Sequence, residues 1–159
     1  MTGPKRVATI GSRVVGVVHW VRSPGCRFSA GRKARMMGHM LRAFGPVSTL
    51  RLMSWLGAWS ARHPSEAHGH LGPIGVTPEE QGRRVGQRLM DVYCADLDRD
   101  GTPGYLETDR AENVRFYRNF GFEVVRTAPV LGVPNYFMWR KPHGEVRNPV
   151  RLRNPEHPA

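Results

Sequence analysis

The sequence predicts an α/β domain built on a mixed sheet. Short β-branched and apolar runs bounded by turn residues alternate with longer segments whose apolar side chains recur every three or four positions. The chain has 159 residues, of which 40% are apolar and 23% charged, as in an ordinary folded domain. We therefore expect one domain over residues 1–142, followed by a flexible tail over residues 143–159 that is rich in Pro and Arg.

The amino-terminal part of the chain predicts a hairpin followed by two helices. Two β-branched runs, residues 7–10 and 14–21, are joined by the turn signal Gly11-Ser12. Helical spacing of apolar residues then covers residues 31–63, and Gly45-Pro46 divides this segment into two helices. These helices form an insertion between strands.

Strands and helices alternate along the rest of the chain. In chain order we predict a strand at 71–76, a helix from 85 to 97, a strand at 105–108, a helix ending at Phe120, and strands at 123–127 and 135–140. Asp109 and Glu112 have the spacing of a capping box at the start of the second of these helices. Thr77 and Glu80 have the same spacing before the first.

The net charge of +11 is unevenly distributed. Residues 1–65 contain two Lys, nine Arg and no acidic residue, whereas residues 66–159 are balanced. Such asymmetry is typical of proteins that bind nucleic acid or membranes, but no nucleic-acid motif accompanies it and the longest apolar run, residues 14–18, is too short to cross a membrane. We expect neither partner, and predict instead a homodimer or an acidic partner that covers the basic amino-terminal region.

The number of cysteines and the opening residues of the chain indicate the cellular compartment. Cys26 and Cys94 are too few for a disulfide framework, and the opening residues lack a cleavage site of the signal-peptide kind. We therefore expect a cytoplasmic protein. His63, His68 and His70 are close in sequence, but no carboxylate or thiol completes a ligand set, so no metal is expected.

The segment after the strand at 71–76 has the pattern of a phosphate site. Residues 81–88 read Gln-Gly-Arg-Arg-Val-Gly-Gln-Arg and open a helix, where free backbone N–H groups and the helix dipole attract anions. Gly82 and Gly86 allow close approach, and Arg83, Arg84 and Arg88 add positive charge. On this local pattern alone, an ordinary capped helix start explains the residues equally well.

Three segments placed in order around this motif resemble the GNAT superfamily of N-acetyltransferases. They are residues 71–80, Tyr105–Thr108 and Glu112–Phe122, and the last two are most similar to the branch that contains puromycin N-acetyltransferase. The family signature between strand and helix is Gln/Arg-x-x-Gly-x-Gly/Ala. Gln81 and Gly86 match it, whereas Arg84 stands where the family has Gly.

The resemblance extends over roughly residues 7–140 and implies a GNAT (acyl-CoA N-acyltransferase) fold, in which helices flank a mixed, mostly antiparallel sheet. The family begins with a strand and two helices that have no counterpart before residue 7, so we expect an amino-terminally shortened sheet. In the family, the strand before the signature splays from its neighbour. Pro73 predicts a bulge in that strand.

The resemblance also implies an activity, the transfer of the acetyl group of acetyl-CoA to a primary amine of a small molecule by direct attack in a ternary complex. The strand would pair with the pantetheine arm, and the backbone of residues 82–87 would hold the pyrophosphate. The implied cofactor-binding residues are Ile74, Gly75, Val76, Gln81, Gly82, Arg83, Arg84, Val85, Gly86, Gln87 and Asn113.

Tyr117 occupies the Tyr position of the family pattern Asn-x-x-Phe-Tyr-x-x-x-Gly-Phe, and is the predicted acid for the leaving thiolate. Glu107 is the predicted general base, with His70 as the other candidate. A catalytically inert acyl-CoA-binding remnant of the fold is the alternative function, favoured by Arg84 and by the missing amino-terminal elements.

Overall fold

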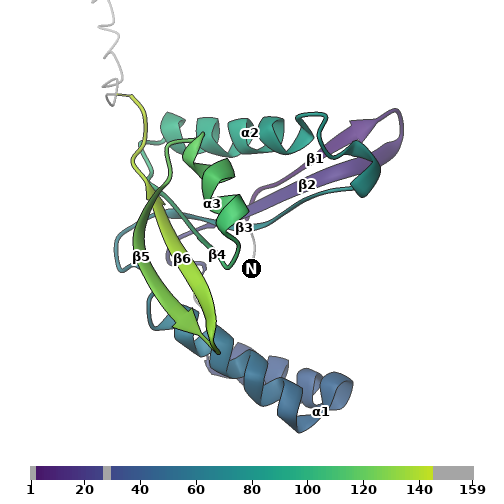
Figure 1. Cartoon of the computed structure of the whole chain (residues 1–159), viewed down its shortest axis with the longest axis vertical. Coiled ribbons are helices and arrows are strands. Elements are labelled where there is room, and N and C mark those ends of the chain that lie inside the picture. The colour runs from purple at the N-terminus through teal and green to yellow at the C-terminus, as the bar shows by residue number, and fades with distance from the viewer. Residues whose placement is uncertain (1–2, 27–29, 145–159) are drawn as a thin grey trace, which may run out of the picture.

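A computed structural model of the chain describes residues 3–26 and 30–144. They form one sheet of six strands in the order β1-β2-β3-β4-β6-β5 (Figure 1). Neighbouring strands are antiparallel except for the β3–β4 pair. The strands are β1 (Lys5–Ile10), β2 (Arg13–Arg22), β3 (Gly69–Val76), β4 (Gly104–Thr108), β5 (Glu123–Val130) and β6 (Val133–Arg140). The predicted α/β fold with a mostly antiparallel mixed sheet is confirmed.

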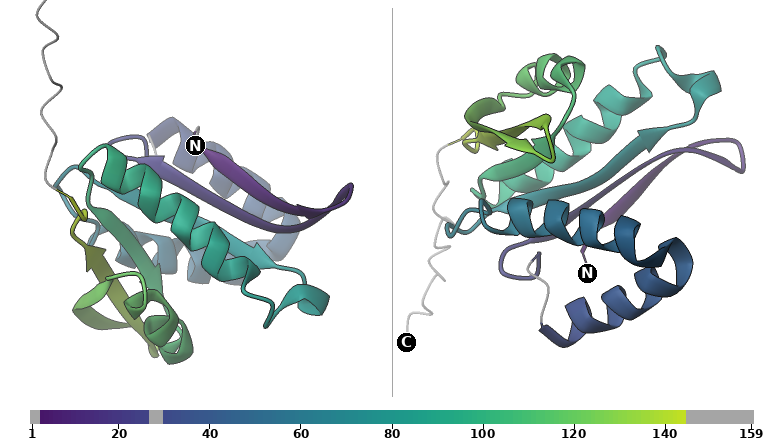
Figure 2. Two further views of the ribbon diagram at one scale, coloured as in Figure 1. Left: turned by 90° about the horizontal axis from the view of Figure 1, so that it is seen from above. Right: turned by 60° about the horizontal axis from the view of Figure 1, so that its bottom comes forward.

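Helices cover both faces of this sheet. The helices are α1 (Ala30–Ser60), the 3-10 turn η1 (Pro78–Glu80), α2 (Val85–Arg99) and α3 (Ala111–Arg118). α2 and α3 lie on one face and α1 lies on the other (Figures 1 and 2). At Gly45 the backbone of α1 leaves the helical region, with φ 73° and ψ 175°, so α1 is the predicted pair of helices joined at a bend. No helix in the described part of the chain is long and apolar enough to cross a membrane.

β3 carries the predicted bulge. Gly72 and Pro73 together oppose the single residue His19 of β2, where the register between the strands shifts. Pro has no N–H to donate to a ladder, so it suits this irregular position. A Cβ on Gly72 would lie 3.0 Å from Nδ1 and 3.1 Å from the carbonyl oxygen of His19, so this close approach requires glycine.

β3 and β4 separate almost as soon as they meet. Their parallel pairing is limited to Gly69 with Gly104 and His70 with Tyr105. From Leu71 to Val76, β3 continues beside β2 but has no partner strand on its β4 side. This opening in the middle of the sheet determines where the candidate site lies.

The main core lies between the sheet and the helices α2 and α3. Its buried members include Val18, Trp20, Leu71, Leu89, Met90, Tyr93, Leu97, Leu106, Val114, Phe122 and Met138. The rings of Trp20 and Tyr93 meet edge to face, with centroids 5.5 Å apart. Cys94 also belongs to this core.

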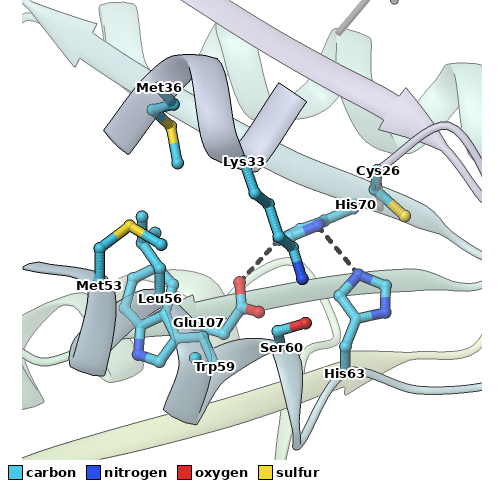
Figure 3. Close-up of a pocket in the computed structure, with 11 residues that line it drawn as sticks. Cys26, Lys33, Met36, Met53, Leu56, Trp59, Ser60, His63, His70 and Glu107 are labelled. Atoms are coloured by element: carbon cyan, nitrogen blue, oxygen red, sulfur yellow. Dashed lines mark hydrogen bonds and ion pairs between the residues drawn. The ribbon is translucent and has the colours of Figure 1, made fainter. Parts of the chain in front are cut away.

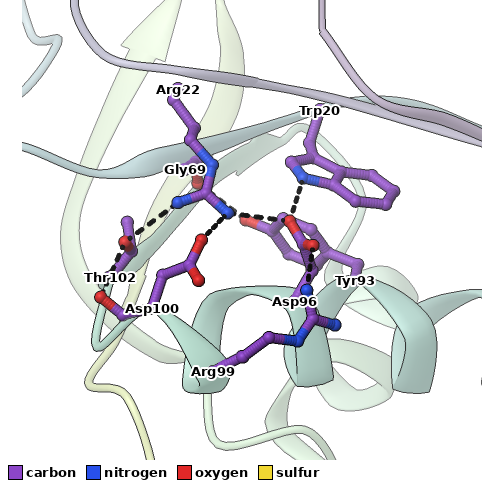
Figure 4. A network of polar contacts seen from close by, with 8 residues as sticks. All are labelled: Trp20, Arg22, Gly69, Tyr93, Asp96, Arg99, Asp100 and Thr102. Atoms are coloured by element: carbon purple, nitrogen blue, oxygen red, sulfur yellow. Dashed lines mark hydrogen bonds and ion pairs between the residues drawn. The ribbon is translucent and has the colours of Figure 1, made fainter. Parts of the chain in front are cut away.

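A polar network ties the end of β2 to α2 (Figure 4). Asp96 accepts hydrogen bonds from Trp20 Nε1 at 3.0 Å and from Arg22 at 2.9 Å, and Arg22 also pairs with Asp100. Burial would raise the pKa of Asp96, but these hydrogen bonds outweigh it and the pKa is lowered. Acidic residues of α2 therefore neutralise part of the amino-terminal positive charge inside the chain.

The predicted capping boxes require correction. α2 begins at Val85, as predicted, but a 3-10 turn precedes it, and the Thr77 side chain makes no capping hydrogen bond with the described residues. α3 begins at Ala111, and its first turn is held by Thr108, whose hydroxyl oxygen accepts hydrogen bonds from the Arg110 N–H and the Asn113 side chain. The predicted capping box gave this role to Asp109, but the hydroxyl of Thr108 at the end of β4 holds the start of α3. α3 ends at Arg118, and the predicted tail lies outside the described residues from 145 onward.

Candidate functional site

The turn between η1 and α2 forms a cradle of backbone groups. Gln81 holds it to β3 by donating a hydrogen bond from its side chain to the carbonyl of Val76 at 3.2 Å. Gly82 and Arg84 both have positive φ, 77° and 62°. The Arg88 N–H bonds to the carbonyl of Arg84 at 3.1 Å, so the N–H groups of residues 85–87 precede the hydrogen-bonded helix and point out of its end.

These groups surround a hollow of about 290 Å³ at the amino-terminal end of α2. It is lined by Val76, Glu80, Gln81, Gly82, Arg84, Val85, Gly86, Gln87 and Phe116. Seven of the predicted cofactor-binding residues therefore lie together. Open N–H groups, the positive end of the helix dipole and an Arg side chain make this hollow suitable for phosphates.

Four predicted cofactor residues are placed differently. Ile74 and Gly75 lie just before the hollow on β3. Arg83 pairs with the carboxylate of Glu80 at 3.3 Å, and the Asn113 side chain donates to Thr108 at 3.2 Å. Their predicted roles remain predictions.

Glu80 is a component that the sequence did not single out. Its side chain is buried in the wall of the hollow, between Arg13 at 2.9 Å and Arg83. The two guanidinium groups neutralise a carboxylate that would otherwise repel an anion. Thus Arg13, from the basic amino-terminal region, is paired with a carboxylate in the wall of the hollow.

Tyr117 lies in the core beneath α3, and its neighbour Phe116 reaches the hollow. The Tyr117 ring meets the rings of Phe116 and Phe122 edge to face, at 5.4 and 6.3 Å between centroids. Burial raises the pKa of Tyr117, so the phenol keeps its proton at neutral pH. Tyr117 is not among the residues that line the hollow or the cavity under α1, so its role as the acid stays a prediction.

A second cavity, of about 130 Å³, lies on the other face of the sheet under α1 (Figure 3). Its lining is mainly apolar, and its polar groups include Lys33 and Ser60 of α1 as well as His70 and Glu107 of the sheet. The lining residues are Cys26, Lys33, Met36, Met53, Leu56, Gly57, Trp59, Ser60, His63, His70 and Glu107. Helical spacing in the sequence predicted that the apolar faces of this insertion would cover the sheet or line an acceptor site.

The two candidate bases form a single pair in this cavity. His70 donates a hydrogen bond from Nε2 to the carboxylate of Glu107 at 2.7 Å, and the Glu107 side chain is only 3% exposed. Burial would lower the pKa of His70, but hydrogen bonds with Cys26 and Glu107 outweigh it and raise the pKa to about 9. Because Glu107 lies at the splayed end of β4, its carboxylate faces the cavity beside the opening in the sheet.

Fold and site together define an acyltransferase-like domain, and comparison with known proteins agrees. Residues 51–124 match the acetyltransferase (GNAT) domain family. A mycothiol acetyltransferase of Brachybacterium faecium is 44% identical over 54 residues, which are 32% of this chain and 16% of that protein. An uncharacterized N-acetyltransferase of Schizosaccharomyces pombe is 30% identical over 82 residues, 49% of this chain and 33% of that protein.

A solved structure supports the same fold. The crystal structure described as histone acetyltransferase HPA2 and related acetyltransferase, from Corynebacterium glutamicum, superposes with a TM-score of 0.64 at 22% identity, over 91% of this chain and 67% of that one. Residues 51–124 are thus similar to a GNAT acetyltransferase domain, and the described chain shares its fold. The stretches that match the two sequence relatives span a third of their length or less.

Proposed function

We propose that the chain is an acetyl-CoA-dependent N-acetyltransferase that modifies the primary amine of a small molecule. One observation carries the proposal. β3 forms a wall of the phosphate-binding hollow at Val76 and of the apolar cavity at His70, and between these residues it has no partner strand on its β4 side. A cofactor with phosphates at one end and an extended arm suits this arrangement.

The donor fits along β3. Backbone groups of Ile74, Gly75 and Val76 are available to the amides of the pantetheine arm, since β4 has turned away. The pyrophosphate would accept hydrogen bonds from the N–H groups of residues 82–87, with Arg84 beside it. The backbone N–H near Val76 would polarise the thioester carbonyl.

The acceptor fits the cavity under α1. Met36, Met53, Leu56 and Trp59 would hold the apolar body of an amine, and Glu107 would attract its ammonium group. Glu107 takes one proton from that group, and the amine attacks the thioester carbon. The carbon–sulfur bond breaks, Tyr117 gives its proton to the thiolate of CoA, and the second proton lost by the nitrogen returns through water to the Tyr117 phenolate. Amide and free CoA are the products.

The names of the relatives support acetyl transfer as the reaction class, because the matching proteins are described as acetyltransferases. The buried, unbridged thiols of Cys26 and Cys94 fit the reducing cytoplasm. The left-handed Arg84 at a glycine position favours the second candidate, an inert protein that binds acyl-CoA.

An assay of CoA release over a library of primary amines separates the two candidates. Transfer predicts release of CoA with at least one amine that has an apolar body. Tyr117→Phe should lower kcat by about 10²–10⁴-fold with CoA affinity unchanged, because it removes only the proton donor. Glu107→Gln should lower the rate by a similar factor. CoA binding without turnover on any amine would support the inert protein instead.

A further inference from the structure

Four side chains that the proposed reaction does not need converge at the base of α1. Cys26 follows β2, His63 follows α1, and His68 and His70 lie at the start of β3. Each offers one ligand atom, and these atoms all lie within 4.8 Å of one another. His63 Nε2 is 3.3 Å from His70 Nδ1, and Cys26 Sγ is 3.9 Å from His68 Nε2.

Each histidine of the cluster is oriented by a hydrogen bond on its outer nitrogen. His63 Nδ1 lies 3.1 Å from the carbonyl oxygen of Pro64, and His68 Nδ1 lies 2.6 Å from that of Glu66. A carbonyl oxygen can only accept, so these two nitrogens carry the protons. His70 Nε2 meets the Glu107 carboxylate at 2.7 Å. Metal-binding histidines are characteristically held in this way, by a carbonyl or a carboxylate on the nitrogen away from the metal.

This arrangement turns electron pairs toward one another. A neutral imidazole with one protonated nitrogen presents a lone pair at the other, so in their neutral forms His63, His68 and His70 direct lone pairs inward, beside the Cys26 sulfur. Without a metal ion, the raised pKa of His70 keeps a proton on its inward Nδ1, 3.3 Å from His63 Nε2. Only a cation between them, either a proton or a metal ion, makes such an arrangement favourable. The ligand atoms of tetrahedral zinc, at bond lengths of about 2.0–2.3 Å, are roughly 3.3–3.8 Å apart. The distances of 3.3 Å between His63 and His70 and 3.9 Å between Cys26 and His68 are close to this range, and the remaining distances, all within 4.8 Å, would shorten by about 1 Å or less on binding.

We propose that Cys26, His63, His68 and His70 bind one divalent zinc ion in a closed tetrahedral site. The Cys26 thiol and Nδ1 of His70 each lose a proton to solvent, so that Cys26 binds as the thiolate and the three imidazoles bind as neutral ligands. Four protein ligands leave no open position, so the ion is structural and takes no part in the acetyl transfer.

The position of the proposed zinc site indicates which segments of the chain the ion would hold together. Cys26 lies just before α1 and His63 just after it, so the ion would join both ends of the helical insertion to the start of β3. The Glu107 carboxylate holds the outer nitrogen of His70, so the ion would also fix the carboxylate that faces the acceptor cavity. The expectation of no metal rested on the histidines' sequence neighbours. The thiol comes from 42 residues away along the chain, and only the fold brings it there.

Metal content and Co²⁺ spectroscopy test the proposal without any substrate. The full chain, purified without a histidine tag, should retain about one zinc per chain after dialysis against a weak chelator. Replacement by Co²⁺ should give the visible bands of tetrahedral Co²⁺ and a near-ultraviolet band for charge transfer from thiolate to cobalt. Added Zn²⁺ at a hundredfold excess over Kd should raise the Tm of the stripped protein by roughly 5–10 °C.

Single substitutions identify the ligands. Cys26→Ser should remove the charge-transfer band, and His68→Gln should lower metal retention at least tenfold. Cys94→Ser and His39→Gln are the matched controls. Cys94 is a residue of α2 buried in the main core, and His39 is exposed on α1. Both should keep wild-type metal content. A wild-type protein that binds no Co²⁺, or one whose charge-transfer band survives Cys26→Ser, would overturn the proposal and leave a shared proton as the cation. Neither result depends on catalysis.

Discussion

Arg84 has the backbone conformation that explains the glycine of the family signature. Its φ of 62° and ψ of 13° lie in the left-handed region, which costs a residue with a Cβ about 1–2 kcal/mol and glycine almost nothing. Arg84 also lines the phosphate-binding hollow. The side chain therefore adds positive charge where the backbone would prefer glycine.

Replacing Arg84 separates these two effects. Arg84→Gly should raise the free energy of unfolding by about 0.5–1 kcal/mol, since relief of the strained backbone exceeds the entropy cost of glycine. It should also weaken CoA binding by about two- to fivefold. Chemical denaturation and calorimetry measure the two quantities. Arg84→Ala is the control, because it removes the charge but keeps the strain. Stabilisation of Arg84→Ala to the same extent would contradict the explanation.

At the residue scale, motif positions were predictable and long-range contacts were not. The residues around Gly82 were correctly expected to lie together, because consecutive residues of one turn line the same hollow. Glu80 and Cys26 were missed because their partners, Arg13 and His68, are far away in sequence. Phe116 both packs against the core and reaches the hollow.

The periodic spacing of apolar residues predicted most helices and strands correctly, because each of these elements buries one face. The hairpin, the bend at Gly45 and the bulge at Pro73 all follow from local rules. Element ends were less predictable. The hairpin of β5 and β6 is longer than the sequence suggested, because Leu131 and Gly132 supply its turn in the left-handed region.

The docking of α1 on the sheet depends on a buried polar contact. Trp59 donates a hydrogen bond from Nε1 to Oδ1 of the fully buried Asn135 of β6 at 2.8 Å. Trp59→Phe keeps an aromatic ring but leaves that oxygen without this donor. We expect a loss of about 1–3 kcal/mol in unfolding free energy, measured by denaturant titration.

Trp55→Phe is the matched control for this contact, because Trp55 lies one turn earlier and meets Trp59 edge to face. It should cost less than Trp59→Phe. Equal losses would show that ring size, and not the hydrogen bond to Asn135, holds α1 on the sheet.

Across the whole molecule, the uneven charge is partly balanced by contacts between distant elements. Arg13 and Arg22 from the basic region meet acidic residues of η1 and α2. A further pair fastens the end of β6, where Arg140 is buried and donates two hydrogen bonds of 2.7 Å to Asp98. Burial would raise the pKa of Asp98, but the hydrogen bonds from Arg140 outweigh it and lower the pKa.

This pair predicts a dependence of stability on pH. Because the folded pKa of Asp98 is lowered, its contribution is fully present above the unfolded value of 3.8 and is lost as the pH falls through the folded value. Asp98→Asn should therefore cost about 2–3 kcal/mol at neutral pH, since Arg140 stays buried without its partner.

Chemical denaturation measured across the acidic pH range checks this prediction. The difference in unfolding free energy between Asp98→Asn and wild type should shrink below about pH 4. Asp91→Asn, at an exposed position of the same helix, should change stability by no more than about 0.5 kcal/mol. A cost for Asp98→Asn that is the same at every pH would contradict the assigned role of the carboxylate.

The central claim is that CoA binds where β3 leaves β4, with its phosphates at the start of α2. Amide hydrogen exchange with and without saturating CoA tests it most directly, because it locates the ligand without requiring the acceptor. The account predicts slower exchange in residues 74–76 and 82–87 and little change in α1. Unchanged exchange in both segments, or protection confined to α1, would contradict it.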